Sequence, residues 1–222
     1  MKYGLIFDVD GVLADTESCI AEASIRMFKD LYGVDLSPED FRPFIGTGAV
    51  RYVEGPAEGL GIAIDTERAI AVRHDNFVRI INARAPIAFP GAKALIQAAS
   101  ASGNWKLAIA TSSPRMKFEE TLKAAQIPFN FFTAIITGDL VTHKKPHPEI
   151  YQVAADTLRV PPEACVVVED AVTGVAAAKA AGIKCIAFTS SFPADRLREA
   201  DHIVDSLFEI DLELLHDLVA GP

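Results

Sequence analysis

Short apolar runs recur along the sequence, and longer stretches with helical periodicity separate them. The runs are too short for helices, and several are rich in valine and isoleucine, as strands buried on both faces of a sheet are. Six runs predict strands, at Tyr3–Phe7, Leu107–Ala110, Ala134–Thr137, Cys165–Val168, Cys185–Phe188 and, more weakly, His202–Val204. Strands that alternate with helices are typical of a mostly parallel sheet, so the sequence predicts an α/β fold.

Helices are predicted between these runs from apolar periodicity and from proline and glycine at their ends. Pro114 suits the first position of a helix, and Gly182 suits a C-terminal stop. The predicted helices are Gly91–Ser102, Pro114–Ala125, Pro148–Leu158, Thr173–Ala181, roughly Ala194–Glu199 and Leu207–Leu218.

One region interrupts the alternation of strands and helices. It follows the first strand, contains no convincing strand, and shows helical patterns at Glu17–Leu31, from Ser37, at Val50–Leu60 and at Thr66–Asn82. We interpret residues 16–82 as a helical insertion, and residues 1–15 together with 83–222 as the α/β core. A chain of 222 residues is long enough for one domain that carries such an insertion.

The composition of the chain argues against some classes of binding partner. The formal net charge of −9 argues against nonspecific binding to nucleic acid or to an anionic membrane. No apolar run reaches about 18 residues, the length expected of a membrane span, and the N-terminus does not resemble a signal peptide. The three cysteines are far apart in apolar surroundings, which favours reduced packing residues of a cytoplasmic protein. We expect a monomer.

Polar side chains gather where the predicted strands end. Asp8 and Asp10 follow the first strand, Thr111 to Ser113 follow the second, Lys145 lies in the loop after the third, and Glu169 and Asp170 follow the fourth. Ligands of open α/β sheets bind at this edge. Converging carboxylates repel one another unless a hard cation lies among them, and Mg²⁺ prefers oxygen ligands. We therefore expect Mg²⁺ held by Asp8, Asp10, Glu169 and Asp170.

This set of groups suits phosphoryl transfer. Asp8 can attack phosphorus and form an aspartyl-phosphate, while Asp10 can protonate the leaving oxygen and later deprotonate a water molecule. Lys145 can pair with Asp8 and with phosphoryl oxygens, and the Thr111 hydroxyl can donate to one of those oxygens. Ser112 is a further candidate contact for the phosphoryl group.

The segments "DVDGVLADTE", "ATSS", "KKPHPEIY" and "VVVEDAVTGVAAAKAAG" resemble the four ordered motifs of the haloacid dehalogenase superfamily. The resemblance implies a Rossmann-like parallel sheet with a helical cap of four helices after the first strand, as in the β-phosphoglucomutase, phosphoglycolate phosphatase and CbbY-like subgroup. It also implies Asp8 as nucleophile, Asp10 as acid/base, a phosphate contact from Thr111, a role for Lys145, and Mg²⁺ held by Asp170, by nearby Glu169 and by the backbone carbonyl of Asp10.

The cap loop "FIGTGAVRY", residues 44–52, contains Gly46 and Gly48 but lacks the third glycine and the preceding strand of a dinucleotide fingerprint. We interpret it as a loop that faces the catalytic cleft, with Gly46 and Arg51 as substrate contacts. Four other basic side chains are interpreted as surface charge: Arg42, Arg73, His74 and Lys106.

Each motif also has a structural reading. Asp-Gly is a turn signal, Glu169 and Asp170 could cap the next helix, and Thr111 to Ser113 could cap another. His143 and His147 have the spacing of a metal pair, but the sequence places no third ligand near them.

The expected function is Mg²⁺-dependent hydrolysis of a small phosphorylated metabolite, most simply a sugar phosphate. The alternatives are a phosphomutase of the β-phosphoglucomutase type and, in another class, a phospho-accepting switch that resembles receiver domains. A dehalogenase would not call for an acid at position 10, and the only lysine of the insertion, Lys29, lies in its first helix rather than in a place that predicts a Schiff base.

Overall fold

The computed structural model describes residues 2–45, 47–85 and 87–220, and its centre is a six-stranded sheet in the order β3-β2-β1-β4-β5-β6. All neighbouring strands are parallel. The strands are β1 (Tyr3–Phe7), β2 (Trp105–Ala110), β3 (Phe132–Ile136), β4 (Cys165–Glu169), β5 (Lys184–Phe188) and β6 (His202–Val204). Each predicted strand is confirmed, and the chain adopts the predicted α/β, Rossmann-like fold.

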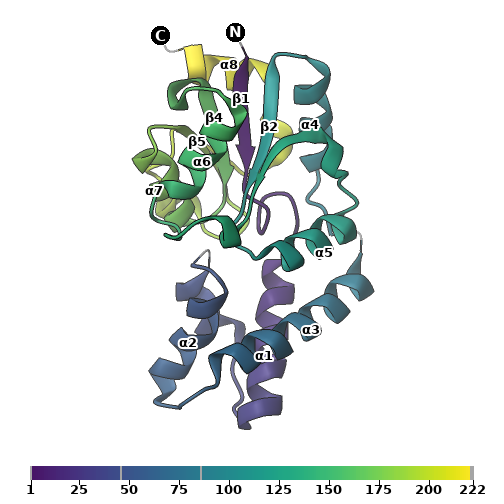
Figure 1. Cartoon of the computed structure of the whole chain (residues 1–222), viewed down its shortest axis with the longest axis vertical. Coiled ribbons are helices and arrows are strands. Elements are labelled where there is room, and N and C mark those ends of the chain that lie inside the picture. The colour runs from purple at the N-terminus through teal and green to yellow at the C-terminus, as the bar shows by residue number, and fades with distance from the viewer. Residues whose placement is uncertain (1, 46, 86, 221–222) are drawn as a thin grey trace.

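Helices cover both faces of the sheet (Figure 1). They are α4 (Ala92–Ala101), α5 (Arg115–Ala125), α6 (Glu149–Leu158), α7 (Val172–Ala180) and α8 (Leu212–Ala220). Because successive side chains of a strand point to opposite faces, Leu5 and Phe7 of β1 join the core under α4 and α8, whereas Ile6 joins the core under α6 and α7. The central strands are therefore apolar along their whole length, as their sequences predict.

Two predicted helices near the C-terminus differ from the structure. The stretch predicted as one helix over 207–218 divides into a 3₁₀ turn at Leu207–Glu209 and α8, which begins at Leu212. The division occurs because Ile210 is buried while the Asp211 side chain accepts the Leu214 N–H at 2.8 Å and caps a new helix. The helix expected near 194–199 is a 3₁₀ turn at Ala194–Arg196.

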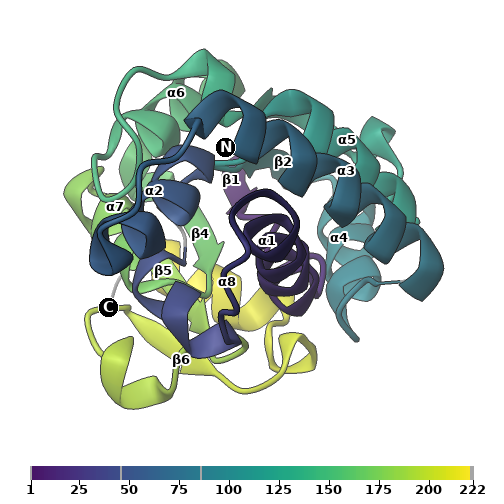
Figure 2. The same cartoon turned by 90° about the horizontal axis from the view of Figure 1, so that it is seen from below.

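The helical insertion lies beyond the carboxyl ends of the strands (Figures 1 and 2). It consists of α1 (Glu17–Tyr32), a 3₁₀ helix (Pro38–Phe44), α2 (Ala49–Leu60) and α3 (Thr66–Arg84). The expected four helices are thus three α-helices and one 3₁₀ helix. A proline inside the 3₁₀ helix, Pro43, cannot donate the backbone hydrogen bond that an α-helix would need there.

The insertion has an apolar centre of its own. Phe28 of α1 lies 6.0 Å from Phe41 between ring centroids, and Phe41 stacks on Tyr52 of α2 at 5.3 Å. The helix α3 packs against both α1 and α5, so it connects the insertion to the core. The division of the chain at residues 16 and 82 stays a prediction; α3 itself runs to Arg84.

In the part of the chain that the structure describes, no helix combines the length and the apolar character that crossing a membrane would require.

Candidate active site

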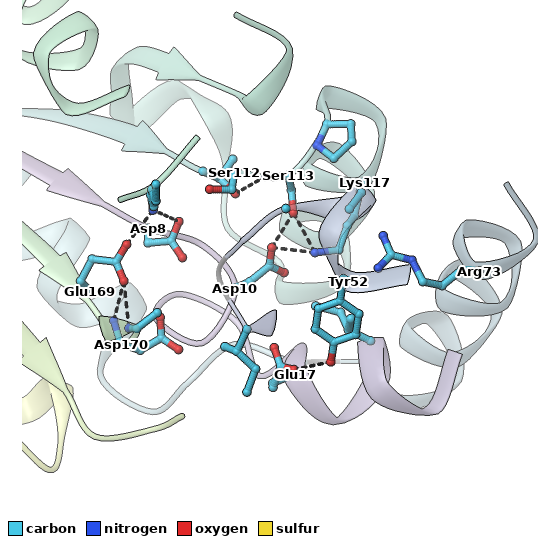
Figure 3. A pocket seen from close by; sticks show the side chains of 18 residues that line it. Asp8, Asp10, Glu17, Tyr52, Arg73, Ser112, Ser113, Lys117, Glu169 and Asp170 are labelled. Carbon is cyan, nitrogen blue, oxygen red and sulfur yellow. Dashed lines mark hydrogen bonds and ion pairs between the residues drawn. The ribbon is translucent and has the colours of Figure 1, made fainter. Parts of the chain in front are cut away.

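A cavity lies between the carboxyl edge of the sheet and the helical insertion. We call it the catalytic cavity. Figure 3 shows the side chains that line it, which come from the loops after β1, β2, β3 and β4, from α5 and from the insertion. The topology explains this convergence, because β1 lies at the centre of the sheet between β2 and β4. The chain therefore delivers these loops, and the loop after β3 beside β2, to one edge of the sheet.

The floor of the catalytic cavity is a buried network of charges. Lys145 donates to Asp8 Oδ1 at 2.9 Å and to Glu169 Oε1 at 2.6 Å. All three residues are less than a tenth exposed. The Tyr151 hydroxyl donates to the same Glu169 oxygen at 2.6 Å, and the N–H groups of Asp170 and Ala171 donate to Oε2 at 2.9 and 3.0 Å. Glu169 therefore fixes the lysine and the loop after β4 at once.

Two glycines permit this close packing. A Cβ on Gly174 would lie 1.8 Å from Glu169 Oε1, so only glycine leaves room for that carboxylate beside α7. Gly11 has a φ of +81° and would place a Cβ 1.9 Å from Asp170 Oδ2. The glycines of the sequence motifs "DVDG" and "EDAVTG" thus shape the spaces that hold two of the acids.

Three carboxylates are arranged as a candidate metal site. Ligand oxygens of Asp8, Glu169 and Asp170 lie within 4.8 Å of one another. Burial raises the pKa of Asp8 to about 7, an effect that Lys145 opposes and Glu169 and Asp10 reinforce. Burial, together with Glu169 and Asp8, also holds the pKa of Asp170 well above its usual range. These acids are thus costly to ionise without a nearby cation.

The charge around the catalytic cavity supports the same conclusion. Among the described residues, five carboxylates line it against three cationic side chains, Arg73, Lys117 and Lys145. With all five carboxylates ionised, two negative charges would remain, which a divalent cation would balance. The donor set is entirely oxygen, so the residues present fit Mg²⁺. Glu169 already accepts four hydrogen bonds, which leaves Asp8 and Asp170 as the freer side-chain ligands.

Asp10 does not belong to this group of three acids. Its Oδ1 accepts from the Thr16 hydroxyl at 2.5 Å, and its Oδ2 accepts from Ser113 Oγ at 2.6 Å and from Lys117 Nζ at 2.6 Å (Figure 3). Burial raises the pKa of Asp10, but Lys117 and these hydroxyls outweigh burial, so the pKa falls below its ordinary value.

The loop after β2 offers donors for an anion. The Thr111 N–H bonds to Ile136 O at 3.0 Å and its Oγ1 accepts from the Ser113 N–H at 3.1 Å, which holds the loop in place. The Ser112 hydroxyl is buried and has no hydrogen-bond partner among the described residues. A buried hydroxyl without a partner is costly, and a phosphoryl oxygen in the catalytic cavity would satisfy it.

Of the two substrate contacts predicted in the helical insertion, only Arg51 lies among the described residues. Arg51 is exposed, pairs with Glu58 at 2.8 Å and lies over the Phe44 ring, and it is not among the residues that line the catalytic cavity. Gly46 lies outside the described residues. The interpretation of Arg73 as surface charge is wrong, since Arg73 is 8% exposed and lines the catalytic cavity 5.5 Å from the Tyr52 ring centroid.

Sequence reasoning missed four polar residues of this site: Glu17, Tyr52, Arg73 and Lys117. Glu17 Oε1 accepts from the Tyr52 hydroxyl at 2.7 Å. Periodicity could have located Arg73, because it lies three residues after Ile70 and four before Phe77 on the inner face of α3. No comparable signal marks Glu17, at the first position of α1.

A family model for haloacid dehalogenase-like hydrolases matches residues 5–188. Protein SUPPRESSOR OF QUENCHING 1 of Arabidopsis thaliana is 35% identical over 88% of the chain, which spans 19% of that protein's length. The phosphorylated carbohydrates phosphatase of Thermotoga maritima is 34% identical over 82% of each chain. A crystal structure of mutant CbbY from Rhodobacter sphaeroides with xylulose-(1,5)bisphosphate has a TM-score of 0.83, 31% identity and coverage of 97% and 99%. The chain belongs to the haloacid dehalogenase-like hydrolase family, as an enzyme of the phosphoric monoester hydrolase class.

Proposed function

We propose that this chain is a Mg²⁺-dependent phosphatase that acts on a small sugar phosphate through an aspartyl-phosphate on Asp8. One observation carries the proposal. The carboxylate of Asp8 pairs with the Lys145 ammonium and has a ligand oxygen within 4.8 Å of those of Glu169 and Asp170, on the floor of a cavity that also contains the buried Ser112 hydroxyl.

In the first step, an oxygen of Asp8 attacks phosphorus, and the bond from phosphorus to the substrate's alcohol oxygen breaks. Asp10, whose hydrogen-bond partners lower its pKa and favour the ionised form, must first take up a proton, which it then donates to that leaving oxygen. In the second step, Asp10 takes a proton from water, whose oxygen attacks phosphorus. The bond between Asp8 and phosphorus then breaks, which releases inorganic phosphate and restores the Asp8 carboxylate.

The remaining groups orient and neutralise the phosphoryl group. Lys145 keeps Asp8 aligned and provides positive charge, while the hydroxyls of Ser112 and Thr111 provide donors; the Thr111 oxygen accepts from Ser113 N–H, which leaves its own proton to donate. We propose that Mg²⁺ would be held by Asp8, Asp170 and the backbone carbonyl of Asp10, with Glu169 as a more distant contributor. When bound, it would neutralise the charge of the carboxylates and of the phosphoryl oxygens.

The wall opposite the floor supports a polyhydroxylated leaving group. Glu17 provides acceptors there, and Arg73 provides donors that make no hydrogen bond or ion pair within the described residues. A sugar needs both kinds of partner, because each of its hydroxyls donates and accepts. The sugar bisphosphate in the CbbY structure and the carbohydrate phosphatase among the relatives support the same substrate class.

Arg73 also supports a second candidate function. A phosphomutase of the β-phosphoglucomutase type must hold a second phosphate away from Asp8, and a buried guanidinium suits that task. The experiment that separates the two is a screen of sugar monophosphates with Mg²⁺, in which free phosphate and isomerised sugar phosphate are both measured. Phosphate release supports the phosphatase, whereas isomerisation without net phosphate release would replace it with the mutase.

We also propose that the chain acts as a monomer in the cytoplasm. The three cysteines are buried and free, as a reducing compartment allows.

A further inference from the structure

Lys117 of α5 lies outside every sequence motif, yet it is one of the most closely held side chains of the catalytic cavity. Its ammonium donates to Asp10 Oδ2 at 2.6 Å and to Ser113 Oγ at 2.8 Å. The same ammonium lies 5.1 Å from the centre of the Phe77 ring on α3. Lys117 is 9% exposed, so these contacts are shielded from solvent.

These contacts determine where Asp10 points. With Thr16 on one oxygen and with Ser113 and Lys117 on the other, the carboxylate is held toward α5 rather than toward the three acids of the candidate metal site (Figure 3). Arg73 and Tyr52, on the wall that would face the leaving alcohol, line the same side of the catalytic cavity. Asp10 is therefore kept on the leaving-group side of Asp8.

The contact with Phe77 adds a second role. Phe77 belongs to the helical insertion, whereas Asp10 and Ser113 belong to loops of the core. One ammonium thus touches the acid/base residue and the helix that covers it. A cation placed over an aromatic face is attracted to it, and the attraction grows when both groups are desolvated.

We propose that Lys117 is a positioning residue, which holds the Asp10 carboxylate in line with the leaving-group oxygen and ties that position to the docking of α3. This inference rests on the proposed function, because it requires Asp10 to act as the acid. It differs from a role in binding the phosphoryl group, which belongs to Lys145 and the loop after β2.

The leaving group provides the test. p-Nitrophenyl phosphate and benzyl phosphate are similar in size, but p-nitrophenolate leaves without a proton whereas the benzyl alkoxide needs one. We expect Lys117→Met to lower kcat/KM for benzyl phosphate, which depends only on the steps up to the aspartyl-phosphate, by about tenfold to a hundredfold, the cost of a misplaced catalytic group. For p-nitrophenyl phosphate we expect a loss of kcat/KM of about threefold or less.

Two further variants complete the design. Lys117→Arg keeps a cation and should retain more activity toward benzyl phosphate than the methionine variant does. Lys123→Met changes an exposed lysine of the same helix and should behave as the unmodified chain. Thermal unfolding of all variants checks that each is folded.

Equal losses of kcat/KM with both esters would assign Lys117 a merely structural role and overturn the inference. A rise in KM for both esters at constant kcat would show direct binding of the ester and would overturn it as well, as would full activity in Lys117→Met. If the unmodified chain with Mg²⁺ releases phosphate from neither ester, the proposed function fails, and the inference fails with it.

Discussion

The floor of the catalytic cavity and the wall contributed by the helical insertion hold their charges differently. On the floor, Lys145 has two carboxylate partners, and Glu169 accepts four hydrogen bonds. On the wall, Glu17 accepts only from Tyr52, and the guanidinium of Arg73 rests over an aromatic ring without an ion pair within the described residues.

The difference follows from what each region must do. Chemistry at phosphorus needs groups whose positions are fixed before the substrate arrives, because reorganisation during the reaction raises the barrier. Recognition of a leaving group needs donors and acceptors that are still free to bind it. A saturated floor and an unsaturated wall are therefore complementary, and substitutions in the two regions should have different signatures.

The largest effect should come from Asp8 on the floor. We expect Asp8→Asn to lower phosphate release by about 10⁴-fold or more, because the amide cannot form the acyl phosphate. Asp15→Asn changes an exposed acid of the same segment and serves as the matched control. Phosphate release from the best sugar phosphate is the measurement. Substantial activity in Asp8→Asn would remove Asp8 from the role of nucleophile.

Substitution of Glu169, on the floor, and of Glu17, on the wall, allows the two regions to be compared directly. In Glu169→Gln, an amide NH₂ replaces one of two carboxylate oxygens that each accept two hydrogen bonds, so donors would face donors. The buried ion pair between Lys145 and Glu169 is also lost. We expect a loss of about 3 kcal/mol in the free energy of unfolding and of about 10² in activity. Glu17→Gln should change the free energy of unfolding by less than about 1 kcal/mol, because the amide oxygen can still accept the hydrogen bond from the Tyr52 hydroxyl.

Urea denaturation of both glutamine variants measures these changes. Equal destabilisation by the two substitutions would contradict the distinction between a saturated floor and an unsaturated wall.

The pH dependence of Mg²⁺ binding tests the floor alone. The pKa of Asp8 in the folded chain is about 7, above the ordinary value of 3.8. A raised pKa means that the folded state holds the proton more tightly than the unfolded state does. The stability contributed by Asp8 is therefore full below about pH 4 and is lost as the pH rises toward 7.

Mg²⁺ competes with that proton. Its affinity should fall by about tenfold for each pH unit below 7, and it should level off above 8. Thermal unfolding with and without Mg²⁺ at pH 6, 7 and 8 measures the change. An Mg²⁺-induced shift of the melting temperature that is the same at all three pH values would show that Asp8 does not hold the ion.

The two regions also differ in how much of their structure could be predicted from the sequence. Asp8 and Thr111 directly follow β1 and β2, and Glu169 is the last residue of β4, so strand order alone carries them to one edge of the sheet. Their identification needed only the β-strand pattern and the chemistry of their side chains. The six strands were predictable for the same reason, since each is a short apolar run.

The wall was less predictable because its geometry depends on how helices pack. Arg51 lies near the start of α2, where sequence does not determine which way the side chain turns, and in the structure Glu58 of the same helix holds it at the surface. The 3₁₀ turn before α8 escaped prediction for a similar reason. Ile210 fits a helical apolar pattern, and only the cap made by Asp211 shows where the helix begins.

Arg73 and Arg51 provide the smallest and most specific comparison within the wall. Both belong to the insertion, but only Arg73 lines the catalytic cavity. We expect Arg73→Met to raise KM for the best sugar phosphate by about fivefold, the cost of one hydrogen bond to the leaving group, with kcat changed by less than about twofold. Arg51→Met should leave both constants within about twofold, because its ion pair with Glu58 is exposed. Steady-state kinetics at saturating Mg²⁺ measures both variants. If Arg51→Met raised KM and Arg73→Met did not, substrate binding would bring the start of α2 to the catalytic cavity, and recognition would belong to α2 rather than to α3.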